Sequence, residues 1–298
     1  MTKCGFVTII GAPNAGKSTL TNRLIGEKIT IVSPKVQTTR STIKGIMVED
    51  NTQLIFCDTP GIFSAKKTLE KAIVENALAQ ISDDMEIIFI IDGRKTISPE
   101  NDIILEYLKK LAKKVVFVVN KIDLLKEEMI DKINNHYQDN QLVDELFFIS
   151  AEHNINIDNL KKALIARAPE SPFLYPEDQL TTVSSRFIAQ EITREKLYQL
   201  LDKELPYNLS VETMSWQENN KGEIRIDQEI YVMKHSQKKI VIGTNGNLLK
   251  KVGTLSRIEL SKFFGTKVSL FLHVKTRPDW LEKPYMYKHM NLKYPKPS

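Results

Sequence analysis

The first 168 residues alternate between short apolar runs and longer stretches that have the apolar spacing of a helix. The short runs are rich in β-branched residues and too brief for helices, and they cover residues 6–10, 43–48, 53–57, 87–91, 115–119 and 147–149. The longer stretches cover residues 18–25, 69–81, 103–111, 129–137 and 160–166. Strands that alternate with helices predict an α/β domain built around a mostly parallel sheet.

The second part of the chain has a different order of elements, namely a helix, two strands, further helices and a final strand. The pattern places helices at 184–201 and 247–263, and strands at 209–216, 223–231 and 267–274. Prolines at positions 169, 172 and 176 interrupt the helical spacing and indicate a linker. The predicted parts are a first domain at 1–168, a linker at 169–181, an α+β domain at 182–280 and a basic, aromatic tail at 281–298.

Composition excludes several classes of protein. Apolar residues make up 42% of the chain and charged residues 27%, as in ordinary globular proteins, and no apolar run approaches the roughly 20 residues of a membrane-spanning helix. The first ten residues show no signal-peptide cleavage pattern. Cys4 and Cys57 stand far apart with no further cysteine, so neither a zinc site nor a disulfide framework is expected. We therefore expect a cytoplasmic protein.

Positive charge is concentrated near the end of the chain. Residues 1–175 hold 22 basic and 23 acidic side chains, whereas residues 176–298 hold 20 and 14. Residues 234–298 alone hold 14 basic residues against three acids, a net charge of +11. Such a block is typical of a surface that binds a polyanion.

A glycine-rich segment follows the first predicted strand and opens the first predicted helix. It runs Gly11-Ala12-Pro13-Asn14-Ala15-Gly16-Lys17-Ser18, which is the pattern and the context of a phosphate-binding P-loop. Backbone amides and the helix N-terminus would hold phosphates, Lys17 would reach the β- and γ-phosphates, and the Ser18 hydroxyl would bind Mg²⁺. The alternative is a glycine-rich turn with a solvated lysine.

Three further segments follow predicted strands. Asp58-Thr59-Pro60-Gly61 could hold Mg²⁺ and face a γ-phosphate, although a segment of this kind taken alone is more often a β-turn. In Asn120-Lys121-Ile122-Asp123, the Asp123 carboxylate would accept the two donors of a guanine edge, Lys121 would lie along the ring and Asn120 would tie the loop to the P-loop. Taken alone, this segment could equally be a polar strand end. Ser150-Ala151 could offer an amide to the guanine carbonyl. Together, at the carboxyl ends of strands, these segments indicate a guanine-nucleotide site.

A Gly-x-x-Gly segment in the second part of the chain would clamp a nucleic-acid backbone, as in KH domains, or merely connect two helices. The charge block and the element order favour the KH interpretation. The RNA-binding candidates are Lys238, Lys239, Gly243, Thr244, Asn245, Gly246, Lys250 and Lys251. Tyr285, Tyr287 and Tyr294 in the tail could stack on bases, but such tails are more often solvated.

The four nucleotide-site segments together resemble the TrmE-Era-EngA-like branch of P-loop GTPases, in which Thr-Pro-Gly-hydrophobic replaces the Ala-Gly-Gln of Ras-type proteins. Gln37-Thr38-Thr39-Arg40, the helix from Ser185 and the turn Glu204–Tyr207 extend the resemblance to members with a C-terminal KH domain of type II. The resemblance implies Lys17, Thr39, Asp58 and Gly61 as catalytic residues. It implies nucleotide contacts at Gly11, Ala12, Pro13, Asn14, Ala15, Gly16, Lys17, Ser18, Thr19, Asp58, Thr59, Pro60, Gly61, Ile62, Asn120, Lys121, Asp123, Ser150 and Ala151.

The resemblance also implies the ligands and the partners. Ser18 and Thr39 would bind Mg²⁺ directly and Asp58 through water, while Asn14 would bind a stimulating K⁺ ion. The expected activity is slow hydrolysis of GTP to GDP and phosphate, which switches affinity for the 3′ region of small-subunit ribosomal RNA during assembly of the 30S subunit. A monomer that binds no DNA is expected. The resemblance also extends to peripheral association with the inner membrane, although no amphipathic anchor stands out in this sequence.

Two alternatives remain open at this point. A non-hydrolysing RNA-binding protein could use nucleotide only for structure, which the intact Lys17, Ser18, Thr39 and Asp58 argue against. A tRNA-modification GTPase would need a separate cofactor-binding domain, which the chain lacks. One feature departs from the family pattern: Thr244-Asn245 occupies the variable pair of the Gly-x-x-Gly loop, where a lysine is common.

Overall fold

The computed structural model describes residues 1–33, 35, 38–65, 68–82, 84–96 and 98–294. The chain forms two compact units, each with its own sheet. The first unit contains Met1–Thr30, Thr39–Thr182 and Asn291–Ser298, and the second contains Ile31–Thr38 and Val183–Met290. The predicted division at residues 168, 181 and 280 remains a prediction from sequence.

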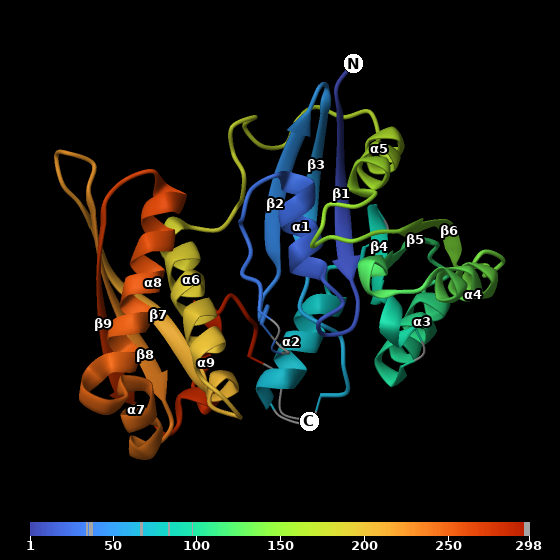
Figure 1. The fold of residues 1–298 in the computed structure, drawn as a ribbon. Coiled ribbons are helices and arrows are strands. Elements are labelled where there is room, and N and C mark those ends of the chain that lie inside the picture. Colours follow the sequence, from blue (N-terminus) through green and yellow to red (C-terminus); the bar gives the residue numbers. More distant parts are fainter. Residues whose placement is uncertain (34, 36–37, 66–67, 83, 97, 295–298) are drawn as a thin grey trace. The chain divides into compact units, whose positions relative to one another are not determined.

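A six-stranded sheet forms the centre of the first unit (Figure 1). Its strands are β1 (Lys3–Ile10), β2 (Ile43–Glu49), β3 (Thr52–Asp58), β4 (Met85–Asp92), β5 (Val115–Asn120) and β6 (Val143–Phe148). Their order in space is β2-β3-β1-β4-β5-β6, and every neighbouring pair is parallel except β2 and β3. The predicted α/β class with a mostly parallel sheet is therefore confirmed.

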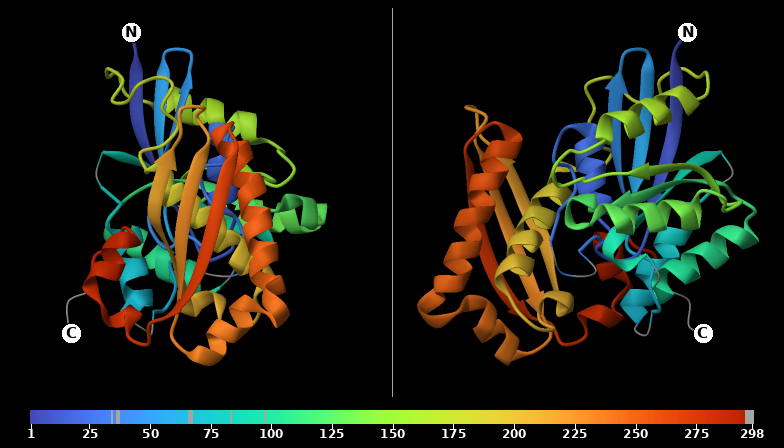
Figure 2. Two further views of the ribbon diagram at one scale, coloured as in Figure 1. Left: turned by 90° about the vertical axis from the view of Figure 1, so that its left-hand side faces the viewer. Right: turned by 45° about the vertical axis from the view of Figure 1, so that its right-hand side comes forward.

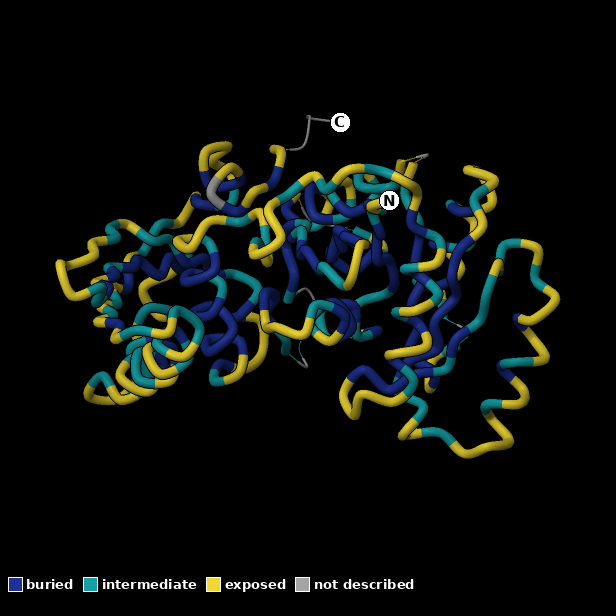
Figure 3. The backbone as a smooth tube through the Cα atoms, turned by 90° about the horizontal axis from the view of Figure 1, so that it is seen from above, coloured by how far each residue is buried: buried dark blue, intermediate teal, exposed yellow. Residues whose placement is uncertain are grey.

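Five helices cover the two faces of this sheet. They are α1 (Lys17–Ile25), α2 (Thr68–Leu78), α3 (Pro99–Lys110), α4 (Glu127–Tyr137) and α5 (Ile157–Arg167). Successive strand residues point to opposite faces, so Ile90 packs in the core under α1 and α5, whereas Ile91 packs in the core under α2, α3 and α4. Figure 3 shows the buried backbone inside each unit and the exposed backbone along loops and outer helices.

The second unit has the α-β-β-α-α-β order of a type II KH domain. Its elements are α6 (Ser185–Leu200), β7 (Leu209–Glu218), β8 (Ile224–Val232), α7 (His235–Ile242), α8 (Asn247–Phe264) and β9 (Val268–Thr276), followed by α9 (Pro284–His289). Strand β8 pairs antiparallel with β7 and parallel with β9. Helices α6 and α8 bury their apolar sides on one face of this sheet (Figure 2). The expected KH class is confirmed.

The segment after β9 is packed, which corrects the expectation of a solvated tail. Trp280, Met286 and Tyr287 are fully buried, and Met290 and Leu292 are nearly so. The Tyr287 hydroxyl donates to the Leu281 carbonyl over 2.8 Å. Tyr287 is therefore unavailable for base stacking, whereas Tyr285 remains exposed. The aromatic residues of this segment were misjudged because their spacing is too short and irregular to indicate a helix.

Among the residues that the structure describes, no helix combines the length and the apolar character that crossing a bilayer requires.

We expect Trp280→Ala to destabilise the second unit by about 3–5 kcal/mol, because it removes a large, fully buried side chain. Urea unfolding followed by far-ultraviolet circular dichroism would measure the change, since the substitution itself removes one of the two tryptophans. The exposed neighbour provides the control, since Tyr285→Ala should change the free energy of unfolding by less than about 0.5 kcal/mol. Equal stability of the two variants would contradict the packed arrangement of this segment.

Candidate nucleotide and RNA sites

The P-loop lies between the end of β1 and the start of α1. Gly16 has a φ of 102°, and a Cβ atom there would lie 2.1 Å from Asn120 Nδ2. A Cβ atom at Gly11 would lie 2.3 Å from the Ile90 carbonyl oxygen. Glycine is thus required at both positions, because residues of β4 and β5 lie too close to the loop to leave room for a side chain. The first helical turn points its free amides toward the same loop, as a phosphate site requires.

Lys17 is almost completely buried and folds back over the P-loop. Its ammonium donates to the carbonyl oxygens of Gly11 and Ala12 over 3.0 and 2.8 Å. Burial lowers the pKa of Lys17 to about 8, against the opposing attraction of Asp58. A phosphate at the loop would offer this ammonium a stronger acceptor than a carbonyl oxygen.

Three oxygen-bearing side chains meet beside the P-loop. The Ser18 hydroxyl lies 2.8 Å from the Thr39 hydroxyl and donates to Asp58 Oδ2 over 2.8 Å. Burial raises the pKa of Asp58 to about 6, although the hydrogen bond from Ser18 and the charge of Lys17 work in the opposite direction. Asp58 Oδ1 is buried and makes no hydrogen bond with the described residues. The cluster therefore holds an unsatisfied carboxylate oxygen next to two hydroxyl groups.

The segment after Asp58 closes over the P-loop. The Thr59 hydroxyl donates to the Ile9 carbonyl over 2.6 Å, and the Ile62 amide donates to the Gly11 carbonyl over 3.1 Å. A Cβ atom at Gly61 would lie 2.9 Å from the Pro13 backbone. Ile62 is buried in the core under α2 and α3, so its side chain contributes packing at this point.

Asn120 connects three loops. Its Nδ2 donates to the Ala15 carbonyl over 2.8 Å, and its Oδ1 accepts from the Ala151 amide over 3.0 Å. Strand pairing between β5 and β6 brings these loops to the same edge of the sheet. The structure thus brings together the segments at Gly11–Ser18, 120–123 and 150–151.

The two charged residues of this loop, Lys121 and Asp123, also contact side chains from other segments. Lys121 has a φ of 67°, and its ammonium donates to the Asn14 carbonyl over 2.6 Å and to Asp92 Oδ2 over 2.8 Å. Asp123 Oδ2 lies 3.6 Å from His153 Nε2. Asp92 and His153 belong to none of the sequence motifs: Asp92 ends the apolar strand β4, and no residue pattern around His153 indicates a role at the site.

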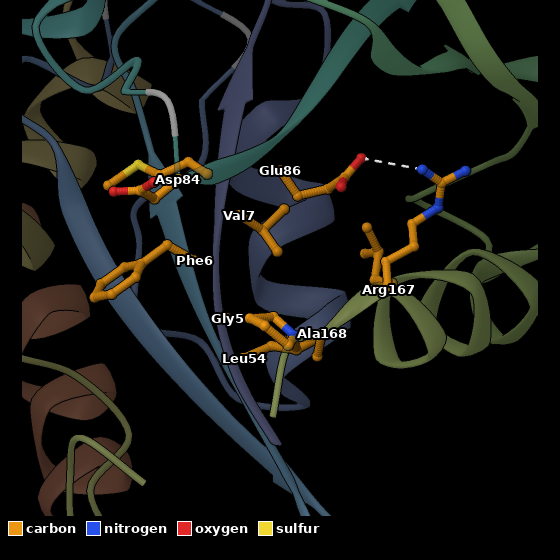
Figure 4. A pocket seen from close by; sticks show the side chains of 11 residues that line it. Gly5, Phe6, Val7, Leu54, Asp84, Glu86, Arg167 and Ala168 are labelled. Atoms are coloured by element: carbon orange, nitrogen blue, oxygen red, sulfur yellow. Dashed lines mark hydrogen bonds and ion pairs between the residues drawn. The ribbon is translucent and has the colours of Figure 1, made fainter. Parts of the chain in front are cut away.

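A separate pocket of about 290 Å³ lies toward the amino ends of β1 and β4, where Gly5, Val7 and Leu54 line it (Figure 4). Arg167 enters its rim and pairs with Glu86 over 3.4 Å. The same guanidinium also pairs with Asp144 and Glu145. Because these charges satisfy one another and lie away from the P-loop edge, the pocket is not part of the nucleotide site.

In the second unit, the Gly-x-x-Gly loop lies between α7 and α8. Gly243 has a φ of 75°, and a Cβ atom there would lie 2.8 Å from Leu248 Cβ. Gly246 also has a positive φ, while Thr244 and Asn245 are exposed. The candidate cations Lys239, Lys250 and Lys251 are exposed and Lys238 is half-buried, and no ion pair joins them to the described acids.

The segment at 31–38 belongs to the second unit although it lies between residues of the first. The Val32 amide donates to Glu195 Oε1 over 2.7 Å, and Arg194 donates to the Thr38 carbonyl over 2.5 Å. Both side chains come from α6 and are buried. Gln37, named with Thr38 and Arg40 in the resemblance, lies outside the described residues. Thr39, the next described position after Thr38, lies in the first unit beside Ser18.

These features define a P-loop GTPase with a C-terminal KH domain. Sequence families agree, because the family described as "50S ribosome-binding GTPase" matches residues 6–121 and the family described as "KH domain" matches residues 204–281. GTPase Era of Afipia carboxidovorans is 44% identical over 99% of this chain and 96% of its own length. GTPase Era of Agrobacterium fabrum is 43% identical over 99% and 93%. The chain therefore belongs to the GTPase Era family.

Solved structures of Era give the same result. Era in complex with MgGDPNP and nucleotides 1506–1542 of 16S ribosomal RNA has a TM-score of 0.90 and 36% identity, with 97% of this chain and 99% of that chain covered. A variant of Aquifex aeolicus Era bound to GDP·AlF4⁻ has a TM-score of 0.89 at 36% identity, with the same coverage. The similarity extends over both units.

We expect Asp123→Asn to weaken GTP binding by about tenfold or more and to strengthen XTP binding. The change replaces a carboxylate acceptor with an amide donor at the base edge, where a bidentate pair is typically worth about 1–3 kcal/mol. Competition of GTP and XTP against a fluorescent guanine nucleotide would measure both affinities. His153→Ala is the control, because it removes the neighbouring imidazole and should leave base preference intact. An unchanged preference in Asp123→Asn would exclude Asp123 as the guanine-selecting residue.

Proposed function

We propose that this chain is a GTP-hydrolysing switch that binds the 3′ region of small-subunit ribosomal RNA and acts in assembly of the 30S subunit. The observation that carries the proposal is the presence, in one chain, of a P-loop site and of a KH loop whose neighbouring lysines make no ion pair with the acids that the structure describes. The Era structure with MgGDPNP and a 16S ribosomal RNA fragment, which this chain resembles over both units, supports the RNA assignment. Peripheral association with the inner membrane rests on family resemblance, and vesicle sedimentation would test it.

The donor set beside the P-loop fits Mg²⁺. This small, hard cation prefers oxygen ligands and keeps several water molecules. Ser18 and Thr39 would supply hydroxyl oxygens, and the unsatisfied Asp58 Oδ1 would accept from a water of the ion. When bound, Mg²⁺ neutralises charge on the β- and γ-phosphates.

Residues of the P-loop and of the segment after Asp58 would have different roles in hydrolysis. Lys17 would stabilise negative charge on the phosphates, and the Gly61 amide would face the γ-phosphate. Ile62 is apolar and buried, so it cannot orient the attacking water as the glutamine of Ras-type proteins does. We therefore expect slow turnover, near the roughly 10⁻⁴ to 10⁻³ per second of intrinsic Ras.

The segment at 31–38 provides a physical basis for switching. Thr38 and Thr39 are joined by a peptide bond, yet Arg194 of the second unit binds the Thr38 carbonyl and Ser18 of the first contacts the Thr39 hydroxyl. Binding of Thr39 to Mg²⁺ and a γ-phosphate would move the adjacent Thr38, and with it the carbonyl oxygen that Arg194 of α6 binds. Loss of the phosphate on hydrolysis would release that constraint, so the nucleotide state and the state of the KH unit are coupled.

Hydrolysis should depend on Mg²⁺ and should be faster in KCl than in NaCl, because Asn14 would bind a K⁺ ion beside the phosphates. Asn14 has a φ of 62°, so Asn14→Gly keeps the backbone conformation and removes only the side chain. Phosphate release in equimolar KCl and NaCl would measure the effect, and Asn14→Gly should abolish the difference. Equal wild-type rates in the two salts would exclude the K⁺ role.

RNA binding should be lost when aspartates replace Thr244 and Asn245, because two negative charges would face the RNA phosphates at an exposed loop. Filter binding to an RNA from the 3′ end of small-subunit ribosomal RNA would measure it. Asn135→Asp on α4 together with Gln138→Glu directly after this helix makes the same change in net charge and is the matched control. Wild-type affinity in the loop variant would show that the loop only connects helices.

Wild-type affinity should also fall steeply with salt. Each phosphate neutralised on a single strand contributes about −0.7 to the slope of log K against log salt, so four or five contacts give a slope of roughly −3. A fourfold rise in salt should then weaken binding by nearly two orders of magnitude. A slope near zero would contradict a charge-driven interface.

A further inference from the structure

Asp92 is a buried carboxylate at the guanine side of the nucleotide site that belongs to none of the sequence motifs. It ends strand β4, and pairing of β4 with β5 places it opposite Asn120, one position before Lys121. Its Oδ1 accepts from the backbone amide and Nε of Arg94, each over 3.0 Å. Its Oδ2 accepts from an Arg94 terminal nitrogen over 2.7 Å and from the Lys121 ammonium over 2.8 Å.

The ammonium of Lys121 is held from two sides. Asp92 contacts it from β4, and the Asn14 carbonyl accepts from it over 2.6 Å from the P-loop. The backbone of Lys121 is in the left-handed region, with a φ of 67°. With its backbone and its ammonium both fixed, the aliphatic part of Lys121 must span the space between the strand end and the P-loop.

The charge state of Asp92 suits this role. Burial favours the protonated acid, but the hydrogen bonds from Arg94 and Lys121 outweigh it and hold the pKa of the Asp92 carboxyl far below its usual value. Asp92 is therefore ionised at every physiological pH, and its attraction for the Lys121 ammonium is permanent.

We propose that Asp92 is a positioning residue for guanine-nucleotide binding: it fixes the Lys121 ammonium against the Asn14 carbonyl so that the Lys121 methylenes form one wall of the base site. The inference rests on the proposed function and on the place along the guanine ring that the sequence predicts for Lys121. Because the base and the ribose are common to GTP and GDP, the contribution of Asp92 is the same for both nucleotides. It acts on binding and leaves the phosphate chemistry to Lys17, Thr39 and Asp58.

Asp92→Asn tests this role with little change in shape. Asparagine still accepts from the Arg94 amide through Oδ1, but it has no charge to hold Lys121. We expect about tenfold weaker binding of both a fluorescent GDP and a fluorescent GTP analogue, as loss of one charge-assisted hydrogen bond predicts. The hydrolysis rate at saturating GTP should stay within twofold, while KM rises. A loss confined to the GTP analogue, or a fall in kcat alone, would overturn the proposal.

A double-mutant cycle with Lys121→Met separates positioning from a purely structural effect. In the Lys121→Met background, Asp92→Asn should cause no further loss, because the group that Asp92 positions is absent. A full additional loss would show that Asp92 acts through the turn at Gly93–Lys95 and would overturn the proposal. Wild-type affinity in Lys121→Met alone would instead refute the assignment of Lys121 to the base site, which is a failure of the proposed function.

Arg94→Gln is the matched control, since it removes the other ionic partner of Asp92 from a side chain that is about half exposed. Its nucleotide affinity should stay within twofold of wild type, and a loss equal to that of Asp92→Asn would assign the effect to Arg94 and overturn the proposal. Circular dichroism would verify folding of each variant. If Asp92→Asn does not fold, Asp92→Ser replaces it, because serine also caps the start of a helical turn.

Discussion

The side chain of Asn120 holds the nucleotide site together, because its amide joins the P-loop to the loop at 150–151. The carboxyl end of β5 places this amide between the two loops, and each of its hydrogen bonds is buried. Gly16 lies so close to Asn120 Nδ2 that no other residue fits without moving one of them. The geometry of the phosphate loop therefore depends on a strand that lies two positions away in the sheet.

The cluster of Ser18, Thr39 and Asp58 depends on a second constraint, which is the burial of Asp58. A buried carboxylate with one free oxygen is costly unless a cation or a donor satisfies it, and the raised pKa of Asp58 expresses that cost. The Ser18 hydroxyl lies within hydrogen-bond distance of both the Asp58 carboxylate and the Thr39 hydroxyl. In the proposed function, a cation bound with the nucleotide would relieve this unfavourable state of the protein.

Helix α6 of the KH unit binds the segment that directly precedes Thr39. Its buried Arg194 and Glu195 bind the backbone of the segment at 31–38, and buried charged residues of this kind are rare in helices without such partners. The Gly-x-x-Gly loop in the same unit presents exposed lysines without acidic partners among the described residues. The second unit thus contains both the segment at 31–38, which directly precedes Thr39, and a surface suited to RNA phosphates.

The sequence by itself determined the α/β and KH classes and the segments of the nucleotide site, because P-loop, strand-end and turn chemistry are encoded within a few neighbouring residues. Tertiary structure alone decided which distant groups meet. Asp92 becomes a partner of Lys121 only because β4 and β5 are neighbours, and Tyr287 is removed from solvent only because the segment after β9 folds back and packs. The grouping of residues 31–38 with α6 is of the same kind. Such pairings depend on strand order and packing, which local spacing does not encode.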